Sequence, residues 1–176
     1  MNRIAAGLLA ATLLTATACG SPATNSPTGT ADAPVAPVEN KPATPKTAEE
    51  VTNALAQKVP SLKLTKVFTP EDDPNKLLGR PNGYTSKTAF TDTRIAEEGE
   101  VAITKENDTL RGGGVEVFAD AAAAKARMDY IQSFGKQTPM LAEYDYVAGG
   151  VLVRVSKQLT PTQAKEYETA LAGIFG

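Results

Sequence analysis

The sequence predicts a single small α+β domain, in which an antiparallel-rich sheet is covered on one face by two or three helices. Three observations support this class. Two capping boxes precede apolar residues at helical spacing, several short runs of apolar residues are typical of strands, and turn signals separate these runs. The expected order of elements is α-β-β-(β)-β-α-β-β-α over residues 47–176.

The first helix is expected to begin at Thr47, because the four residues Thr47-Ala48-Glu49-Glu50 have the spacing of a capping box. Apolar residues then recur at helical spacing as far as Val59, and Pro60 ends the run. An apolar strand is expected from Leu62 to Phe68.

The middle of the chain alternates between turns and strands. A polar loop is expected at residues 71–75, and Asn82-Gly83 marks a turn before a strand from Tyr84 to Asp92. The stretch from 93 to 111 is polar and weakly periodic, and the optional strand of the predicted order falls at Val101–Thr104.

The next unit is a strand followed by a helix. Gly112-Gly113-Gly114 is interpreted as a loop that leads into a strand at Val115–Phe118. Asp120 is expected to cap an alanine-rich helix that ends at Gly135 and packs its apolar face on the sheet.

A hairpin and a helix complete the predicted domain. Strands are expected at Tyr144–Val147 and Val151–Val155, joined by a two-residue turn at Gly149-Gly150. Thr160, followed by proline and by Gln163 three residues later, predicts the start of the last helix.

The N-terminal residues predict an address outside the cytoplasm. Residues 1–18 combine a positive charge with a short apolar stretch and small residues, and Cys19, the only cysteine of the chain, follows at once. This arrangement resembles the signal peptide of bacterial lipoproteins, although Ala16 stands where those signals usually carry leucine. The resemblance implies that Cys19 is lipidated with fatty acyl groups such as palmitate and becomes the mature N-terminus; an ordinary cleaved signal is the alternative. Residues 19–46, which are rich in proline, alanine and threonine, are expected to be a disordered linker.

The domain itself is similar to uncharacterised lipoproteins of Gram-positive bacteria. The similarity covers about residues 66–171 and rests on four stretches: Leu77–Lys87, Gly113–Phe118, Arg127 with Tyr130-Ile131, and Tyr144–Tyr146 with Val151–Pro161. It implies a location at the cell membrane and an architecture, but it transfers no active residue.

The composition excludes several classes of function. The chain has no histidine and one cysteine, which excludes a histidine-based catalytic triad, a Cys/His zinc site and a disulfide framework. A net charge of −2 makes nucleic acid an unexpected partner. We therefore predict no catalytic residue, no metal site and no cofactor.

Charged residues that interrupt apolar strands are the best candidates for a site. Glu116 lies between two valines, as does Arg154, so each points to the sheet face opposite its valines. They are expected either to bind a ligand or to form a cross-strand ion pair. Arg80 and Tyr84, in and after the loop 72–84, complete the predicted ligand-binding set, with the alternative that Arg80 clamps its own loop.

Arg127 is expected on the border of a helix face, where it either pairs with a carboxylate or extends to water.

These observations predict a monomeric, membrane-anchored extracytoplasmic lipoprotein that acts as a binding or interaction module. A lipid on Cys19 would contact the membrane, and an envelope protein, a peptide or a glycan would be the partner. The alternatives are a cell-envelope hydrolase that uses paired carboxylates, and an inhibitor or sensor of a secreted enzyme. A flat polar sheet face would favour a protein partner, and a deep pocket would favour a small ligand.

Overall fold

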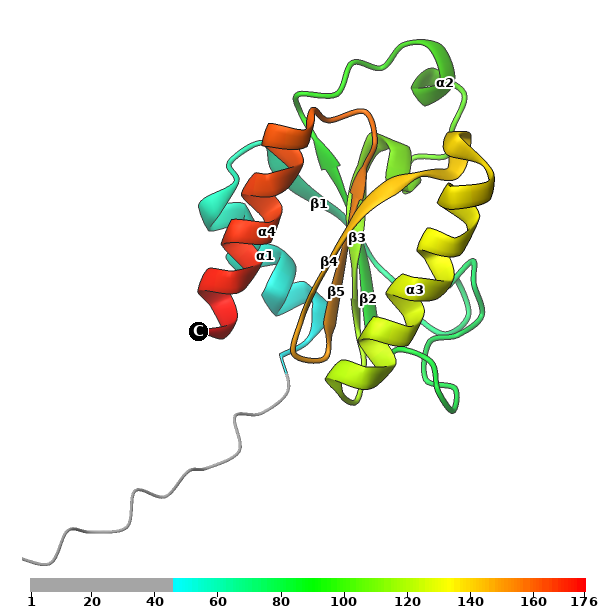
Figure 1. The fold of residues 1–176 in the computed structure, drawn as a ribbon, viewed down its shortest axis with the longest axis vertical. Helices are drawn as coiled ribbons and strands as arrows, with labels where there is room; N and C mark the ends of the chain where they lie inside the picture. Colours follow the sequence, from blue (N-terminus) through cyan, green and yellow to red (C-terminus); the bar gives the residue numbers. More distant parts are fainter. Residues whose placement is uncertain (1–45) are drawn as a thin grey trace, which may run out of the picture. The chain divides into compact units, whose positions relative to one another are not determined.

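The computed structural model describes residues 46–176, so the predicted signal peptide, Cys19 and all of the linker before Lys46 lie outside the described residues. Figure 1 shows the elements in chain order. They are α1 (Ala48–Lys58), β1 (Leu62–Val67), β2 (Ser86–Asp92), α2 (Gly99–Ala102), η1 (Thr109–Arg111), β3 (Gly112–Val117), α3 (Ala121–Gln137), η2 (Pro139–Leu141), β4 (Glu143–Ala148), β5 (Val151–Ser156) and α4 (Pro161–Phe175).

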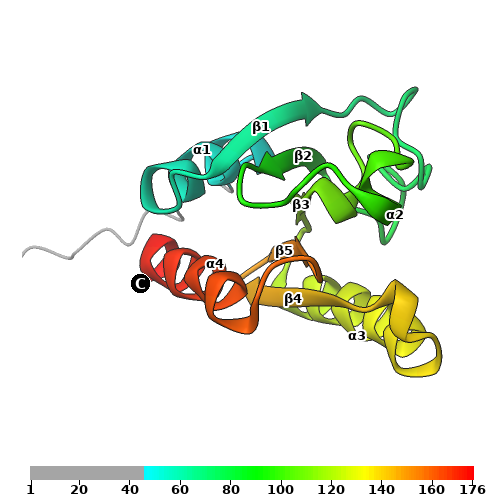
Figure 2. The same cartoon turned by 90° about the horizontal axis from the view of Figure 1, so that it is seen from above.

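The five strands form one sheet in the order β1-β2-β3-β5-β4, and every neighbouring pair is antiparallel. The predicted α+β class is confirmed. Helices α1 and α4 cover one face of the sheet, whereas α3 packs on the opposite face against β4 and β5 (Figure 2). The second face is therefore covered by α3 only beside those two strands.

The two faces follow from the two-residue period of the strands. Val115 and Val117 of β3 and Val153 of β5 point into the larger apolar cluster, beneath α1 and α4. Leu152 points to the other face and joins the smaller cluster with residues of α3. Glu116 and Arg154 alternate with the valines, so they share the face of α3, as the sequence predicted.

Capping explains where α1 and α4 begin. Thr47 accepts a hydrogen bond from the Glu50 N–H, and the Glu50 side chain bonds back to the Thr47 backbone. Thr160 and Gln163 make the same reciprocal pair at the start of α4. Both predicted capping boxes are confirmed, and each satisfies donors that the first helical turn leaves free.

Three local predictions are wrong. Residues 101–104 form no strand. Val101 instead belongs to the short helix α2, where it is buried. Gly112–Gly114 is the first half of β3, and a Cβ atom at Gly113 would clash with the Arg154 carbonyl oxygen and the Phe90 ring, so only glycine fits there. Helix α3 continues past Gly135, which packs closely against Ala142 and does not cap the helix.

Within residues 46–176, no helix combines the length and the apolar character that crossing a membrane requires.

Candidate ligand-binding cleft

A large open cleft lies on the sheet face that α3 only partly covers. Its volume is about 1710 Å³. Helix α3 forms one wall, the loop between β1 and β2 together with residues 103–110 forms the other, and strands β2, β3 and β5 contribute the floor. Gly114 and Ala89 lie opposite each other in the β2–β3 register, and these small residues deepen the floor between the flanking charged side chains.

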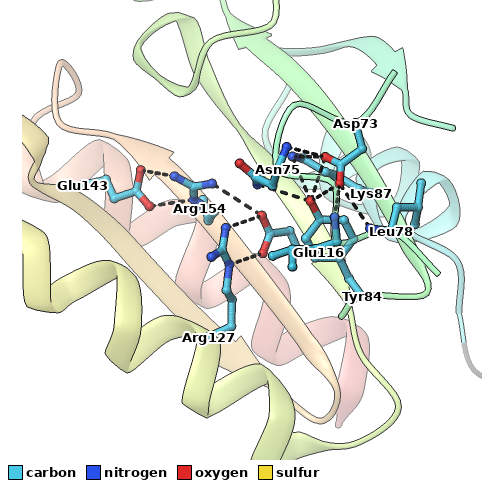
Figure 3. Close-up of polar contacts among 10 residues, drawn as sticks. Asp73, Asn75, Leu78, Tyr84, Lys87, Glu116, Arg127, Glu143 and Arg154 are labelled. Atoms are coloured by element: carbon cyan, nitrogen blue, oxygen red, sulfur yellow. Dashed lines mark hydrogen bonds and ion pairs between the residues drawn. The ribbon is translucent and has the colours of Figure 1, made fainter. Parts of the chain in front are cut away.

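Glu116 is the centre of the polar floor. This carboxylate is only 1% exposed, and two guanidinium groups approach it: Arg127 Nε at 3.0 Å and Arg154 Nη1 at 3.4 Å. Arg154 also donates to both carboxylate oxygens of Glu143, at 2.6 and 2.9 Å. The four side chains form a row across β3, β5, β4 and α3 (Figure 3). The row is charge-balanced, because it contains two carboxylates and two guanidinium groups.

A second buried cluster holds the loop wall against the sheet. Asp73, which is 0% exposed, accepts hydrogen bonds from the Leu77 and Leu78 N–H groups, from Tyr84 Oη at 2.7 Å, and from Lys87 Nζ at 2.9 Å. Lys87 is one of the β2 residues that line the cleft, and its ammonium also lies over the rings of Phe68 and Tyr84. The loop conformation therefore depends on one carboxylate.

Burial and pairing change the pKa values of this cluster. Burial alone would raise the pKa of the Asp73 carboxyl, but hydrogen bonds from Tyr84 and Lys87 outweigh it and hold that pKa well below its usual range. Burial lowers the pKa of Lys87, and the bond to Asp73 opposes the decrease. Burial and the bond to Asp73 both raise the pKa of Tyr84.

Asn75 joins the two clusters. The amide orientation that satisfies its neighbours places the carbonyl oxygen 3.1 Å from Lys87 Nζ and 3.2 Å from Arg127 Nη2. In this orientation Asn75 links the Asp73 cluster to Arg127 and so to the Glu116 row. Figure 3 shows the residues of both clusters.

Part of the rim of the cleft is apolar, although exposed polar residues such as Asp72, Asn82 and Lys105 also line it. Five of the seven large hydrophobic side chains that the described residues expose line the cleft, among them Ile103 at 88%, Met140 at 68% and Tyr130 at 56% exposure. Tyr130 and Phe134 lie one turn apart on α3, with their ring centroids 4.9 Å apart in an edge-to-face arrangement. Exposed apolar groups concentrated around one concavity are typical of a binding site.

A buried carboxyl lies beside the row. Asp145 faces Arg154 across the β4–β5 pair, and neither of its buried oxygens has a hydrogen-bond partner among the described residues. Burial, followed by the negative charge of Glu143, raises the pKa of Asp145 to about 8. A hydrolase with paired carboxylates requires such a raised pKa, but it also requires an accessible acid, and the Asp145 oxygens are closed to solvent.

The structure separates the four predicted ligand-binding residues into two groups. Glu116 and Arg154 form the expected ion pair and line the cleft. Tyr84 is fully buried in the Asp73 cluster, where it supports the loop. Arg80 is exposed and is not among the residues that line the cleft, and its side chain forms no ion pair within residues 46–176.

Sequence reasoning missed several residues that build the cleft. Lys87 lies between Ser86 and Thr88, so no apolar run surrounds it, and the argument that found Glu116 does not find Lys87. Glu143 and Asp145 alternate with two tyrosines and share one strand face. Asp73 carried no sequence signal beyond its place in a polar loop. Arg127 does pair with a carboxylate, one of the two alternatives that the sequence left open.

Comparison with models of protein families, with curated proteins and with solved structures gives no match. The residues of the described part also contain no cluster of three or more acidic or thiol side chains placed to hold a metal ion.

Proposed function

We propose that this protein is a lipid-anchored extracytoplasmic binding module, and that the cleft between α3 and the β1–β2 loop receives a small or extended ligand. The observation that carries the proposal is the combination of a partly apolar rim with a buried, charge-balanced polar floor in one open cleft. Binding sites typically unite an apolar lining with a few fixed polar groups.

The shape of the sheet face supports a small or extended ligand over a flat protein contact. The polar residues Glu116 and Arg154 lie at the bottom of a cleft and are held in place by Arg127 and Glu143. A rigid network of this kind needs little reorganisation when a ligand binds, so less conformational entropy is lost.

The proposed anchor rests on the sequence. Cys19 follows a short apolar stretch that resembles a lipoprotein signal, and two acyl chains would hold a protein stably where one chain binds only marginally.

We expect Cys19→Ala to remove the cleaved, mature protein from the membrane fraction, because the side chain that would carry the lipid is absent. Cell fractionation of the variant, with Ser21→Ala as a neighbouring control, measures the effect. The variant should be secreted or remain as a full-length precursor, whereas the control should stay membrane-bound. A cleaved Cys19→Ala protein that remains on the membrane would rule out the lipid anchor.

A bulky side chain on the cleft wall should block binding. Ala126 is exposed on α3 and lines the cleft, so Ala126→Trp fills the space without disturbing the core. Residues 46–176 are titrated with N-phenyl-1-naphthylamine, a neutral apolar fluorophore, and we expect the variant to lose about tenfold or more in affinity.

Ala121→Trp is the matched control, since Ala121 is exposed at the start of the same helix outside the cleft lining. Its affinity should equal that of the unmodified protein. Equal binding by all three proteins would place the fluorophore elsewhere and refute the cleft as the binding site. Circular dichroism confirms beforehand that each protein is folded.

A further inference from the structure

The cleft is longer than a site for one small molecule. Both Ala122 and Phe134 of α3 line it, and twelve residues of helix correspond to about 18 Å. The volume of about 1710 Å³ also exceeds the roughly 300–1,000 Å³ of most small-molecule pockets. An extended ligand, composed of several units, fits these dimensions best.

The charges of the cleft favour a ligand without net charge. Five basic and five acidic side chains line it. Four of the five basic groups already have a carboxylate partner: Lys87, Arg127, Arg154 and Lys157. A charged ligand would have to compete with these pairs, and breaking a buried pair leaves an uncompensated charge.

The distribution of polarity argues against an acyl chain. A lipid site places apolar groups in its interior, whereas here the floor is ionic and the apolar residues lie at the rim, for example Ile103 and Met140. A hydrocarbon chain on that floor would cover polar groups without replacing their contacts with water.

The strands in the cleft floor have no free edge with which a peptide backbone could form ladder hydrogen bonds. The floor strands β2, β3 and β5 are internal strands of the sheet, so their ladder hydrogen bonds are already formed on both sides. Addition of a peptide strand needs a free sheet edge.

The polar floor instead has spare donors in fixed planar groups. A guanidinium has five N–H donors. Arg127 uses three of them, on Glu116 and Asn75, and Arg154 uses three, on Glu143 and Glu116. Each guanidinium therefore retains two N–H groups, and both side chains are partly exposed to the cleft. The N–H donors of these arginines lie beside the carboxylate acceptors of Glu116 and Glu143. This arrangement suits a ligand that carries hydroxyl groups on neighbouring atoms.

The α3 wall adds an aromatic surface to this floor. Tyr130 and Phe134 are exposed at the cleft, and with Phe68 and Phe118 they make four of the ten aromatic residues of the chain. An aromatic ring presents an apolar face with a polarised edge. The complementary ligand unit has an apolar ring face and a hydroxylated edge, which describes a pyranose sugar.

We propose that the cleft binds a neutral linear oligosaccharide, with its hydroxyl groups on the Glu116–Arg127–Arg154 floor and its ring faces on Tyr130 and Phe134. This inference rests on the proposed function, because it names the ligand class of the same cleft.

Isothermal titration calorimetry of the full chain tests this proposal with a panel of neutral tetrasaccharides. The panel contains α- and β-linked hexoses and β-linked N-acetylhexosamines, and tetragalacturonate is the anionic comparison. We expect at least one neutral member to bind more tightly than tetragalacturonate. Tyr130→Ala should weaken that binding about tenfold. Phe175→Ala, an exposed aromatic outside the cleft lining, should leave it unchanged.

The outcomes separate this inference from the proposed function. If no neutral tetrasaccharide binds while N-phenyl-1-naphthylamine still binds in the cleft, the sugar class is overturned and the binding module stands. Tighter binding of tetragalacturonate would overturn the argument from charge balance. Sugar binding that is unaffected by Tyr130→Ala would overturn the assigned site. If neither the sugars nor the fluorophore binds in the cleft, both proposals fail.

Discussion

Asp73→Ala is expected to reduce the free energy of unfolding by about 3–5 kcal/mol, which is the usual cost of removing one partner of a buried ion pair. The substitution leaves the ammonium of Lys87, a residue that is only 7% exposed, without its carboxylate. It also leaves the Leu77 and Leu78 N–H groups without their acceptor, so the β1–β2 loop should detach from the sheet. Urea unfolding at pH 7, followed by circular dichroism, measures the change.

The neighbouring residue provides the control. Asp72 also pairs with a lysine, Lys66, but both side chains are more than a third exposed. Asp72→Ala should therefore reduce the free energy of unfolding much less than Asp73→Ala does. Equal effects of the two substitutions would show that the Asp73 cluster does not hold the loop.

The pH dependence of Asp73 has a definite sign. Its pKa is lower in the folded protein than in the unfolded chain, where an aspartate titrates near 3.9. The stability that it contributes is fully present above about pH 4 and is lost as the pH falls below that value. Asp73→Ala should remove this acid-dependent loss.

Asp145→Asn is expected to stabilise the protein at pH 8 by roughly 1–3 kcal/mol, because it replaces a buried carboxyl without hydrogen-bond partners by a neutral amide. The folded pKa of about 8 lies above the unfolded value of about 3.9. Between these values the folded state binds more protons than the unfolded state, so stability falls as the pH rises from about 4 to 8.

Thermal unfolding at several pH values between 4.5 and 8 tests this expectation. The variant should lack the contribution of Asp145 to the decline, and the difference from the unmodified protein should grow with pH. Asp129→Asn, an exposed aspartate on α3, is the control and should behave like the unmodified protein. A variant whose advantage is the same at every pH would contradict the raised pKa of Asp145.

Much of the fold could be predicted from local signals. The capping residues Thr47, Asp120 and Thr160 mark helix starts through contacts with residues three positions later, so the sequence contains all the information needed. Alternation around Glu116 and Arg154 placed both side chains on one sheet face for the same reason.

The sheet face chosen by α3 could not be predicted in this way. Its apolar residues, such as Ala124 and Ile131, indicate that the helix packs on a sheet, but they do not distinguish one apolar face from the other. The strand order determines only which strands the helix covers, not which face it takes. Because β5 lies between β3 and β4, α3 packs over β4 and β5 and leaves β2 and β3 open as the cleft floor.

The four predicted site residues lie in two different places because their positions depend on different information. Glu116 and Arg154 follow from the strand period, and both lie in the cleft. The roles of Arg80 and Tyr84 depend on how the loop folds back onto Lys87, through the contacts that Asp73 makes. No local sequence pattern encodes that loop arrangement. The arrangement buries Tyr84 and leaves Arg80 outside the cleft.

The most direct test of the account locates a bound ligand on the protein. Amide chemical shifts of residues 46–176 are followed by NMR while N-phenyl-1-naphthylamine is added. The account predicts that the largest changes occur along the α3 wall of the cleft, at Ala126, Tyr130 and Phe134. Changes confined to α1 and α4, on the opposite face of the sheet, would contradict it.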